Sequence, residues 1–286
     1  MTPSHMTPSQ LNLTFRNNDP MSDTSPRAYA PRPGVLHENT WPAMRDAMWP
    51  VALLPFGATE PHNTHLPYGT DTMLGGEVAA RVAAVCIANG TNVVALPAIP
   101  FGVNTTQLDL PLTINVMPST QLAILRDVVK SLEPHGVRGL VLLNAHGGNE
   151  LRALVRELQP STAIMLAIVN WWQAADHSVF AEPGDHAGEL ETAAVMHVAP
   201  HLVVPDRGTW GEGRTNPSTL EGVRNGVAWM PRRWTQATND TGVGDPRAAT
   251  AERGATFMAQ AVERIAAFCC ELAVADPARL WENPRR

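Results

Sequence analysis

The sequence predicts an α/β fold with a mainly parallel central sheet and helices on both of its faces. Short apolar runs alternate along the chain with segments in which apolar residues recur at helical spacing, which is typical of βαβ units. The apolar runs are continuous, as in strands that are buried on both faces. The chain has 286 residues, 44% hydrophobic and 17% charged, and is long enough for one large domain or two small ones.

Four apolar runs are predicted as strands, and the segments between and after them as helices. The strands are expected at residues 51–56, 92–96, 139–143 and 163–169. Helices are expected at residues 73–89, 119–132 and 149–158, with a further one beginning near Gly188 and a long one at 247–273.

The two ends of the pattern are less regular. Residues 1–33 are rich in Pro, Ser, Thr and Asn without periodicity and are predicted as a flexible N-terminal tail. Residues 34–286 are then expected to form a single domain. Within it, residues 203–246 are rich in Gly, Pro, Trp and Asn, and are predicted as an ordered, irregular region that could line a site or an interface.

Composition and charge exclude several classes of protein. A net charge of −6 and a pI near 5.9 give no electrostatic reason to expect nucleic acid or an anionic membrane as a partner. No apolar run approaches the roughly 20 residues of a membrane span, and no secretory h-region is apparent. Three cysteines without a CxxC pattern indicate neither a disulfide framework nor a thiolate metal site. A cytoplasmic protein that acts on a small molecule is expected.

Polar residues gather where two predicted strands end. In open parallel sheets, ligands bind beyond the carboxyl ends of the strands. The first strand runs into GATEPHNTHLPYGTD, which carries Glu60, His62, His65 and Asp71. In extended chain Glu60 and His62 project to the same side, and the following loop can fold back to deliver Asp71. Carboxylates and imidazoles are the ligands of Zn²⁺, Mn²⁺ or Fe²⁺ in hydrolytic sites.

Two further segments add to this cluster. The third strand runs into AHGGNE, which carries His146, and DHAGELET opens a predicted helix. His186 and Glu189 are three residues apart and would share a helix face, from which Glu191 would point away. Two histidines and three carboxylates for metal, with one histidine left for proton transfer, fit two metal ions about 3.5–4 Å apart.

Each of these residues also has an ordinary structural interpretation. A lone histidine is more often a hydrogen-bonded core residue than a metal ligand, and Glu189 could simply be favoured at a helix start. The joint occurrence at two strand ends and one helix start favours a metal site. Other chemistries have less support, because the chain lacks a GxSxG elbow, a GxxxxGK[ST] phosphate loop and a GxGxxG segment after a strand.

Tryptophans and glycines are the expected substrate-binding residues. Trp171 and Trp172 directly follow the fourth predicted strand, and Gly147 and Gly148 would let backbone approach a ligand closely. The alternative for each tryptophan is to fill the core or an oligomer interface.

The irregular region holds further candidates. It contains Trp210, Trp229 and Trp234, which could also wall a pocket. Arg232 and Arg233 could meet a carboxylate or phosphate on the substrate, or could simply be solvated.

At these residues the sequence resembles the creatininase family of metal-dependent amidohydrolases. We find similarity between GATEPHNTHLPYGTD and the family's G-[SA]-x-E-x-H-G-x-H-L-P-x-x-T-D, between NAHGGN and N-G-H-G-G-N, and between DHAGELET and D-x-HAGE-x-ET. Two more stretches of the family are similar to PFGVNTTQLDLPLTI and TGVGDPRAATAERG. The five segments occur in the family's order between residues 51 and 254.

The resemblance implies a three-layer α/β sandwich that assembles as a homohexamer, with two divalent metal ions (Zn or Mn, or else Fe) in each chain. It implies that Glu60 and His146 serve one metal, that His62 serves the other, and that Asp71 bridges them. It further implies the roles of two residues in the HAGE-type segment: Glu189 completes the second metal site, and His186 is the catalytic residue that moves protons.

Some positions depart from the family pattern. Gly148 stands where creatininase proper has a metal-binding carboxylate, and Gln107 stands where many relatives have histidine. Leu112 and Asn63 each replace a glycine. These departures weaken creatinine as the substrate, and the family also includes a formamide deformylase and a peptidase that trims a cofactor precursor.

The hypothesis from sequence is therefore a metal-dependent amidohydrolase that hydrolyses a C–N bond, other than a peptide bond, in a small amide that may be cyclic. The alternatives are a family peptidase or deformylase with the same metal centre, and a non-catalytic, metal-stabilised scaffold.

Overall fold

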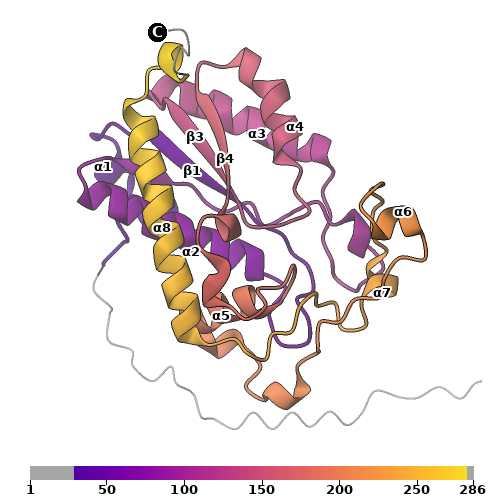
Figure 1. Ribbon diagram of the computed structural model, residues 1–286. Helices are drawn as coiled ribbons and strands as arrows, with labels where there is room; N and C mark the ends of the chain where they lie inside the picture. Colours follow the sequence, from indigo (N-terminus) through magenta and orange to yellow (C-terminus); the bar gives the residue numbers. More distant parts are fainter. Residues whose placement is uncertain (1–28, 282–286) are drawn as a thin grey trace, which may run out of the picture. The chain divides into compact units, whose positions relative to one another are not determined.

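The computed structural model describes residues 29–281, and within them a four-stranded parallel sheet forms the centre (Figure 1). The strand order is β2-β1-β3-β4. The strands are β1 (Val51–Phe56), β2 (Val93–Ala95), β3 (Gly139–Asn144) and β4 (Met165–Asn170). Each predicted strand is present, with ends shifted by one or two residues, and the predicted parallel α/β fold is confirmed.

Five longer helices follow the predicted pattern, and three short ones lie in the connections of the described part. The longer helices are α2 (Thr70–Ala88), α3 (Pro118–Leu132), α4 (Leu151–Leu158), α5 (Glu189–Val198) and α8 (Ala251–Val274). The short ones are α1 (Trp41–Met44), α6 (Glu221–Arg224) and α7 (Trp234–Ala237). The last two interrupt the irregular region that was expected at residues 203–246.

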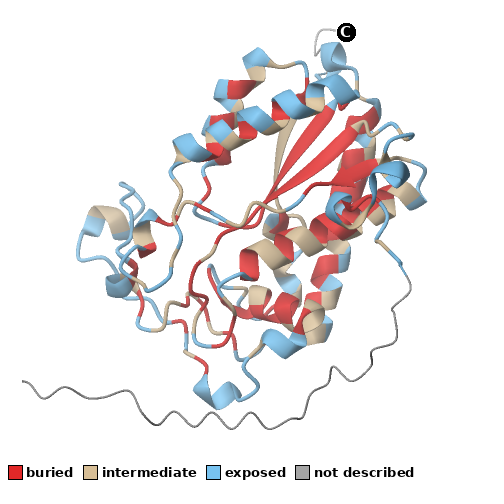
Figure 2. Cartoon of the chain, turned by 180° about the vertical axis from the view of Figure 1, so that it is seen from behind, coloured by how far each residue is buried: buried red, intermediate tan, exposed pale blue. Residues whose placement is uncertain are grey.

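The sheet is the middle of three layers because both of its faces are covered. Alternate side chains of β1 point to opposite faces, so that Val51 and Leu53 pack with α2, α5 and α8, whereas Ala52 and Leu54 pack with α3 and α4. Figure 2 shows the buried residues along the strands and on the sheet-facing sides of these helices. Strands that are buried on both faces explain the continuous apolar runs of the sequence.

The predicted tail falls mostly outside the described residues, since residues 1–28 are not described. Arg32, near the end of the predicted tail, forms ion pairs with Glu38 and Glu77. Val35 is buried and pairs with Ala95 at the end of β2. Among the described helices, none is long and apolar enough to cross a membrane.

The strand order creates a switch point between β1 and β3. The chain moves from β1 through α2 to β2 on one side, and then crosses through α3 to β3 on the other side of β1. Because α2 and α3 lie on opposite faces of the sheet, their connections diverge beyond the carboxyl ends of β1 and β3. A crevice at this place is where open α/β sheets bind ligands.

Helix α5 is held against α8 by a close backbone approach at Gly254. A Cβ atom at this position would overlap with the Ala193 carbonyl group of α5. Since α5 carries part of the candidate site described below, this packing fixes the site's position relative to the core.

We expect Gly254→Ala to lower the free energy of unfolding by about 1–3 kcal/mol, because the added methyl group pushes α5 and α8 apart. The matched control is Gly76→Ala in α2, where a Cβ would meet no atom within 4 Å. That substitution should stabilise the protein by about 0.5–1 kcal/mol, the helix-propensity difference between the two residues. Chemical denaturation of both variants measures this, and equal effects of the two would contradict the packing argument.

Candidate metal centre

The loop after β1 folds back on itself, carries two of the expected metal ligands, Glu60 and His62, and leads to a third. The backbone N–H of Glu60 donates to the carbonyl group of Tyr68 at 3.1 Å, and that of Leu66 to the carbonyl group of His62 at 3.3 Å. This closure leads the chain into α2, whose first turn holds Asp71. The predicted fold-back of the loop is confirmed.

Asn63 connects this loop to the irregular region. Its φ of 55° lies in the left-handed region, where glycine is most favourable and asparagine is among the best tolerated of the other residues. Its side-chain amide donates to the Gly211 carbonyl group at 3.0 Å, and its own N–H donates to Thr241 Oγ1 at 2.9 Å. Asparagine thus replaces the family's glycine without loss of the turn, and it adds contacts to the irregular region.

The His62 ring is fully buried and held at both nitrogens. Its Nδ1 lies 3.0 Å from the backbone carbonyl oxygen of Glu60. Since a carbonyl group only accepts, Nδ1 carries the hydrogen and donates it. The other nitrogen, Nε2, lies 3.0 Å from Asp71 Oδ1 and 4.0 Å from Glu191 Oε2.

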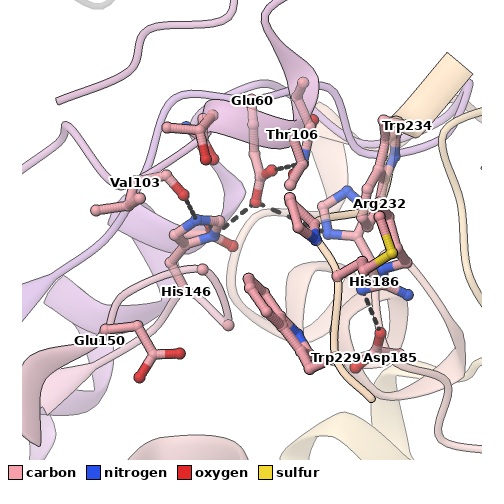
Figure 3. A pocket seen from close by; sticks show the side chains of 18 of the residues that line it. Glu60, Val103, Thr106, His146, Glu150, Asp185, His186, Trp229, Arg232 and Trp234 are labelled. Atoms are coloured by element: carbon pink, nitrogen blue, oxygen red, sulfur yellow. Dashed lines mark hydrogen bonds and ion pairs between the residues drawn. The ribbon is translucent and has the colours of Figure 1, made fainter. Parts of the chain in front are cut away.

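His146 follows β3 and faces the same carboxylates (Figure 3). Its Nε2 lies 3.1 Å from the Val103 carbonyl oxygen and donates to it by the same reasoning. Its Nδ1 is directed to the centre, 2.7 Å from Glu60 Oε1 and 3.1 Å from Asp71 Oδ2.

His186 completes the set of three histidines. Its Nε2 donates to the Pro61 carbonyl group at 2.8 Å, and its Nδ1 lies 3.8 Å from Glu60 Oε1. The centre of its ring lies 4.3 Å from that of His62. The next residue, Ala187, has a φ of 48°, a strained conformation for a residue with a Cβ atom, and such strain is typical of functional sites.

The three imidazoles therefore share one arrangement. Each donates one ring N–H to a backbone carbonyl group and directs its other nitrogen at carboxylate oxygens, which is the usual support of a metal-binding histidine. The side chains form three overlapping groups whose ligand atoms lie within 4.8 Å of one another: Glu60, Asp71 and His146; His62, Asp71 and Glu191; Glu60, His62 and His186.

Two carboxylate oxygens of this centre lack hydrogen bonds. Glu60 Oε1 and Asp71 Oδ2 are buried and accept none from any residue in the described part of the chain. Buried carboxylate oxygens without hydrogen bonds are costly unless a cation compensates them. The donor set of carboxylates and imidazoles therefore fits a divalent metal ion such as Zn²⁺, Mn²⁺ or Fe²⁺.

The electrostatics point the same way. Burial alone would lower the pKa of His62, but the carboxylates of Asp71, Glu191 and Glu60 together outweigh burial and raise that pKa to about 10. Burial is likewise outweighed at His146, where Glu60 and Asp71 raise the pKa well above its usual value. Burial raises the pKa of Glu191. The centre thus favours positive charge beside its rings, whether a proton or a metal ion supplies it.

The structure places Glu189, a predicted metal ligand, outside the three ligand groups. Its fully buried carboxylate forms an ion pair with Arg253 of α8 and accepts the backbone N–H groups of Ala181 and Glu182 at 2.8 and 3.0 Å. Glu191 lies at the centre instead, where its Oε2 also accepts the N–H of Ala187 at 2.6 Å.

The start of the helix explains this difference. The three-residue spacing predicts that His186 and Glu189 share a helix face, but α5 begins only at Glu189. His186 lies before the helix in extended chain, and the left-handed turn at Ala187 separates it from the helix. With His186 outside the helix, the spacing argument does not apply, and residue 191 is the one that faces the metal loop.

The structure also explains two departures from the family pattern, Gln107 and Gly148. Gln107 is buried and donates a hydrogen bond from Nε2 to Glu60 Oε2, so it orients this carboxylate. A Cβ atom at Gly148 would overlap with His146 Nε2 and the Val103 carbonyl oxygen. Glycine is therefore required there by the hydrogen bond that holds His146.

A cavity of about 270 Å³ opens beside the carboxylates (Figure 3). Gly147 and Gly148 line it, in agreement with their expected position. Its other walls come from residues 103–107 and from residues 229–234 of the irregular region. Likeness to a family segment was the one signal in the sequence for the first of these walls.

The structure does not place Trp171 and Trp172, which were predicted as substrate-binding residues, at this cavity. Trp171 is buried and packs edge-on against Phe257 of α8, and Trp172 packs against the same core. They follow a strand end, but α8 covers that end of the sheet. The tryptophans that line the cavity are Trp229, which is exposed, and Trp234, which is buried.

His65 and Trp210 form a separate buried pair. The two rings stack with centres 4.4 Å apart, and His65 Nε2 lies 2.8 Å from Thr192 Oγ1 of α5. Burial, assisted by nearby His62, lowers the pKa of His65 to about 4. His65 thus connects the metal loop to the helix that carries Glu191, and does not itself belong to the ligand groups.

Residues 37–269 match the creatininase family, described as creatinine amidohydrolase, and the chain belongs to this family of hydrolases. A curated relative, the mycofactocin precursor peptide peptidase of Mycobacterium ulcerans, is 30% identical over 223 residues, which cover 75% of this chain and 82% of the relative.

Solved structures agree with this assignment. A putative creatinine amidohydrolase from Bacteroides fragilis is 36% identical with a TM-score of 0.82, covering 88% of this chain and all of the other. Two creatininases, one named with Mn and one of Zn–Zn type, share the fold at 22% identity and TM-scores of 0.68 and 0.67, each covering 85% of this chain and 100% and 99% of the other.

We expect Glu191→Gln to lower the affinity for Mn²⁺ or Zn²⁺ by at least about tenfold, the loss found even for residues that only support a ligand. Glu189→Gln is the matched control, because it removes the negative charge of another glutamate in the same helix, two residues away from Glu191. It should keep metal affinity but lower stability by about 2 kcal/mol, since Arg253 loses its charged partner.

Equilibrium dialysis with metal analysis, and thermal unfolding of the metal-free proteins, separate the two effects. Loss of metal in Glu189→Gln with normal affinity in Glu191→Gln would reverse the assignment.

Proposed function

We propose that the protein is a metal-dependent amidohydrolase that hydrolyses a C–N bond in a small amide, lactam or formamide. The observation that carries this proposal is the set of three tethered imidazoles that face shared carboxylates around Asp71. Two divalent ions, Mn²⁺ or Zn²⁺ as in the names of two structural relatives or else Fe²⁺, would bind here. Glu60, Asp71 and His146 would hold one, and His62, Asp71 and Glu191 the other.

Bound metal ions lower the pKa of water towards neutrality and polarise a carbonyl group, which are the two activations that amide hydrolysis needs. The chain contributes positioning. Asp71 presents one oxygen to His62 and the other to His146, so its carboxylate can serve both ligand groups. Gln107 and the backbone carbonyl groups hold Glu60 and the rings in fixed orientations.

His186 is the proposed proton carrier. It lines the cavity, and its Nδ1 faces Glu60 at 3.8 Å, farther from the carboxylates than the facing nitrogens of the other two histidines. It can therefore take a proton in the centre and give it to the nitrogen that leaves, which is a poor leaving group without a proton. The N–H groups of Gly147 and Gly148, which line the same cavity, are the backbone donors that we propose for the oxyanion.

A peptidase is the second candidate, because a relative at 30% identity is named as one. A second cavity of about 400 Å³ shares Thr105, Thr106, Pro231 and Arg232 with the first, so a substrate longer than a small amide has space to extend. A panel of lactams, N-formyl compounds and short peptides, tested on the metal-loaded protein, distinguishes the two. Hydrolysis of peptides alone would favour the peptidase.

We expect His186→Ala to lower kcat by about 100-fold or more on whichever substrate the panel identifies, the usual contribution of a general acid or base. Metal content should stay near the wild-type value, because His62 and His146 keep their ligands and tethers. Turnover and metal analysis on the same preparation test this. If metal content falls in step with activity, His186 is a ligand rather than a proton carrier.

We also propose that the chain forms a homo-oligomer, a hexamer by analogy with the family. Large apolar side chains near the cavity are exposed, among them Leu108, Leu112, Val227 and Trp229. Apolar surface of this kind is typical of interfaces. Light scattering should give a mass several times that of the chain, and the mass of a monomer at micromolar concentration would contradict the proposal.

A further inference from the structure

Apart from the histidines, the charged side chains that line the cavity at the metal centre are acidic except at one residue. Five carboxylates line it, from Glu60, Asp71, Glu150, Asp185 and Glu191. Among its lining residues, Arg232 is the one arginine or lysine. A permanent positive charge in an otherwise acidic cavity is a feature that metal binding alone does not require, and it indicates a negative group on the substrate.

The guanidinium of Arg232 is held in position but keeps N–H groups available for further hydrogen bonds. It lies over the ring of Trp234, 4.6 Å from the ring centre, and its Nη2 donates to Asp185 Oδ2 at 3.1 Å. Both side chains of this ion pair are at least half exposed, and such pairs contribute little to stability. A planar guanidinium offers five N–H donors in a geometry that matches a carboxylate, so a substrate can bind beside Asp185 or displace it.

Arg232 lies on the His186 side of the centre. The Arg232 guanidinium lies over the face of the Trp234 ring, and the His186 ring packs nearly perpendicular to the same ring, with ring centres 5.3 Å apart. In Figure 3, His146 and Val103 lie on one side of Glu60, and His186, Trp234 and Arg232 on the other. If His186 protonates the leaving nitrogen, the group that Arg232 binds belongs to the amine half of the substrate.

We propose that the substrate is an N-acyl amino acid, or a short acylated peptide that is cleaved before its C-terminal residue. In both cases the free carboxylate of the substrate binds Arg232. This inference rests on the proposed function and specifies its substrate class. In the reaction, water adds across the C–N bond. The acyl carbon gains the hydroxyl group and becomes a carboxylic acid, and the nitrogen gains the proton to leave as the free amine of the amino acid.

The neighbours of Arg232 suit the rest of such a molecule. Trp229 and Met230 line the same cavity and are exposed, so they offer apolar surface to an amino-acid side chain. Burial of a large apolar side chain against them favours binding, because it removes apolar surface from water. An amino acid with an apolar side chain, such as methionine or phenylalanine, is therefore the favoured leaving half.

Arg233 provides a matched control. It is the next residue and carries the same charge, but it does not line the catalytic cavity. It lines the second cavity instead, with its Nε 4.0 Å from Asp109 Oδ2. Substitution at Arg233 changes the net charge as much as substitution at Arg232 and leaves the proposed contact in place.

The test compares N-acetyl-L-methionine with N-acetyl-L-methioninamide, which differ only at the carboxylate. Binding is measured by calorimetry on the Mn²⁺-loaded protein, in buffers that do not chelate the metal. Hydrolysis is measured by release of the amine. The wild type should bind the acid about 10- to 100-fold more tightly than the amide, the range of charge-assisted hydrogen bonds. Arg232→Gln should abolish this preference, and Arg233→Gln should keep it.

Asp185→Asn adds a change of opposite sign. Because Asp185 competes for the guanidinium, its neutralisation should tighten binding of the acid and leave binding of the amide unchanged. If the role of Arg232 were purely structural, Arg232→Gln and Asp185→Asn would not change the affinity for the acid in opposite directions.

The outcomes separate this inference from the proposed function. A carboxylate preference that depends on Arg232, without hydrolysis of any compound in the panel, supports the substrate class and contradicts the hydrolase. Hydrolysis of the panel with equal affinity for acid and amide, or a preference that survives Arg232→Gln, overturns the inference alone. Failure of both compounds to bind also overturns it.

Discussion

The centre depends on one repeated interaction, the hydrogen bond from each of three imidazole rings to a backbone carbonyl group. The acceptors belong to Glu60, Pro61 and Val103, which lie in segments that follow β1 and β2. Each tether decides which ring nitrogen is left for the carboxylates, so the tautomers follow from the backbone. The backbone in turn is positioned by the register of β1 with β3, in which Phe56 is opposite Asn144 and both strands end together. The metal site is thus a consequence of sheet pairing.

Such a centre is costly to fold without a cation. Two helices direct their N-termini at it, with Asp71 in the first turn of α2 and Glu191 in the first turn of α5. The partial positive charge of helix N-termini offsets part of the cost of burying these carboxylates. Carboxylate oxygens without hydrogen bonds and a left-handed Ala187 remain as strain that ligand binding can relieve. Close packing between α5 and α8 at Gly254 supplies the rigidity that keeps this arrangement in place.

The sequence was sufficient for the fold and for most of the candidate centre, because both follow local rules. Continuous apolar runs identify the strands of a sheet covered on both faces, and polar residues just after β1 and β3 identify the ligand edge. Glu191 was missed because its orientation depends on where α5 begins, which a spacing rule cannot locate. Trp171 was misplaced because its strand end is covered by α8, a helix some eighty residues away in the sequence. Contacts between distant segments decided both cases.

The residues that select a substrate lie apart from those that would hold the metal. The ligand groups come from the segments that follow β1 and β3, from the start of α2, and from the start of α5 and the segment before it. The cavity walls come from residues 103–107 and 229–234, which belong to connections. Connections can change in sequence without disturbing sheet pairing, so one metal centre can serve different amide substrates. Asn63 joins the two parts, since it follows a metal-facing histidine and binds Gly211 and Thr241 of the irregular region. The proposed substrate contacts of Arg232 and Trp229 would come from this same irregular region.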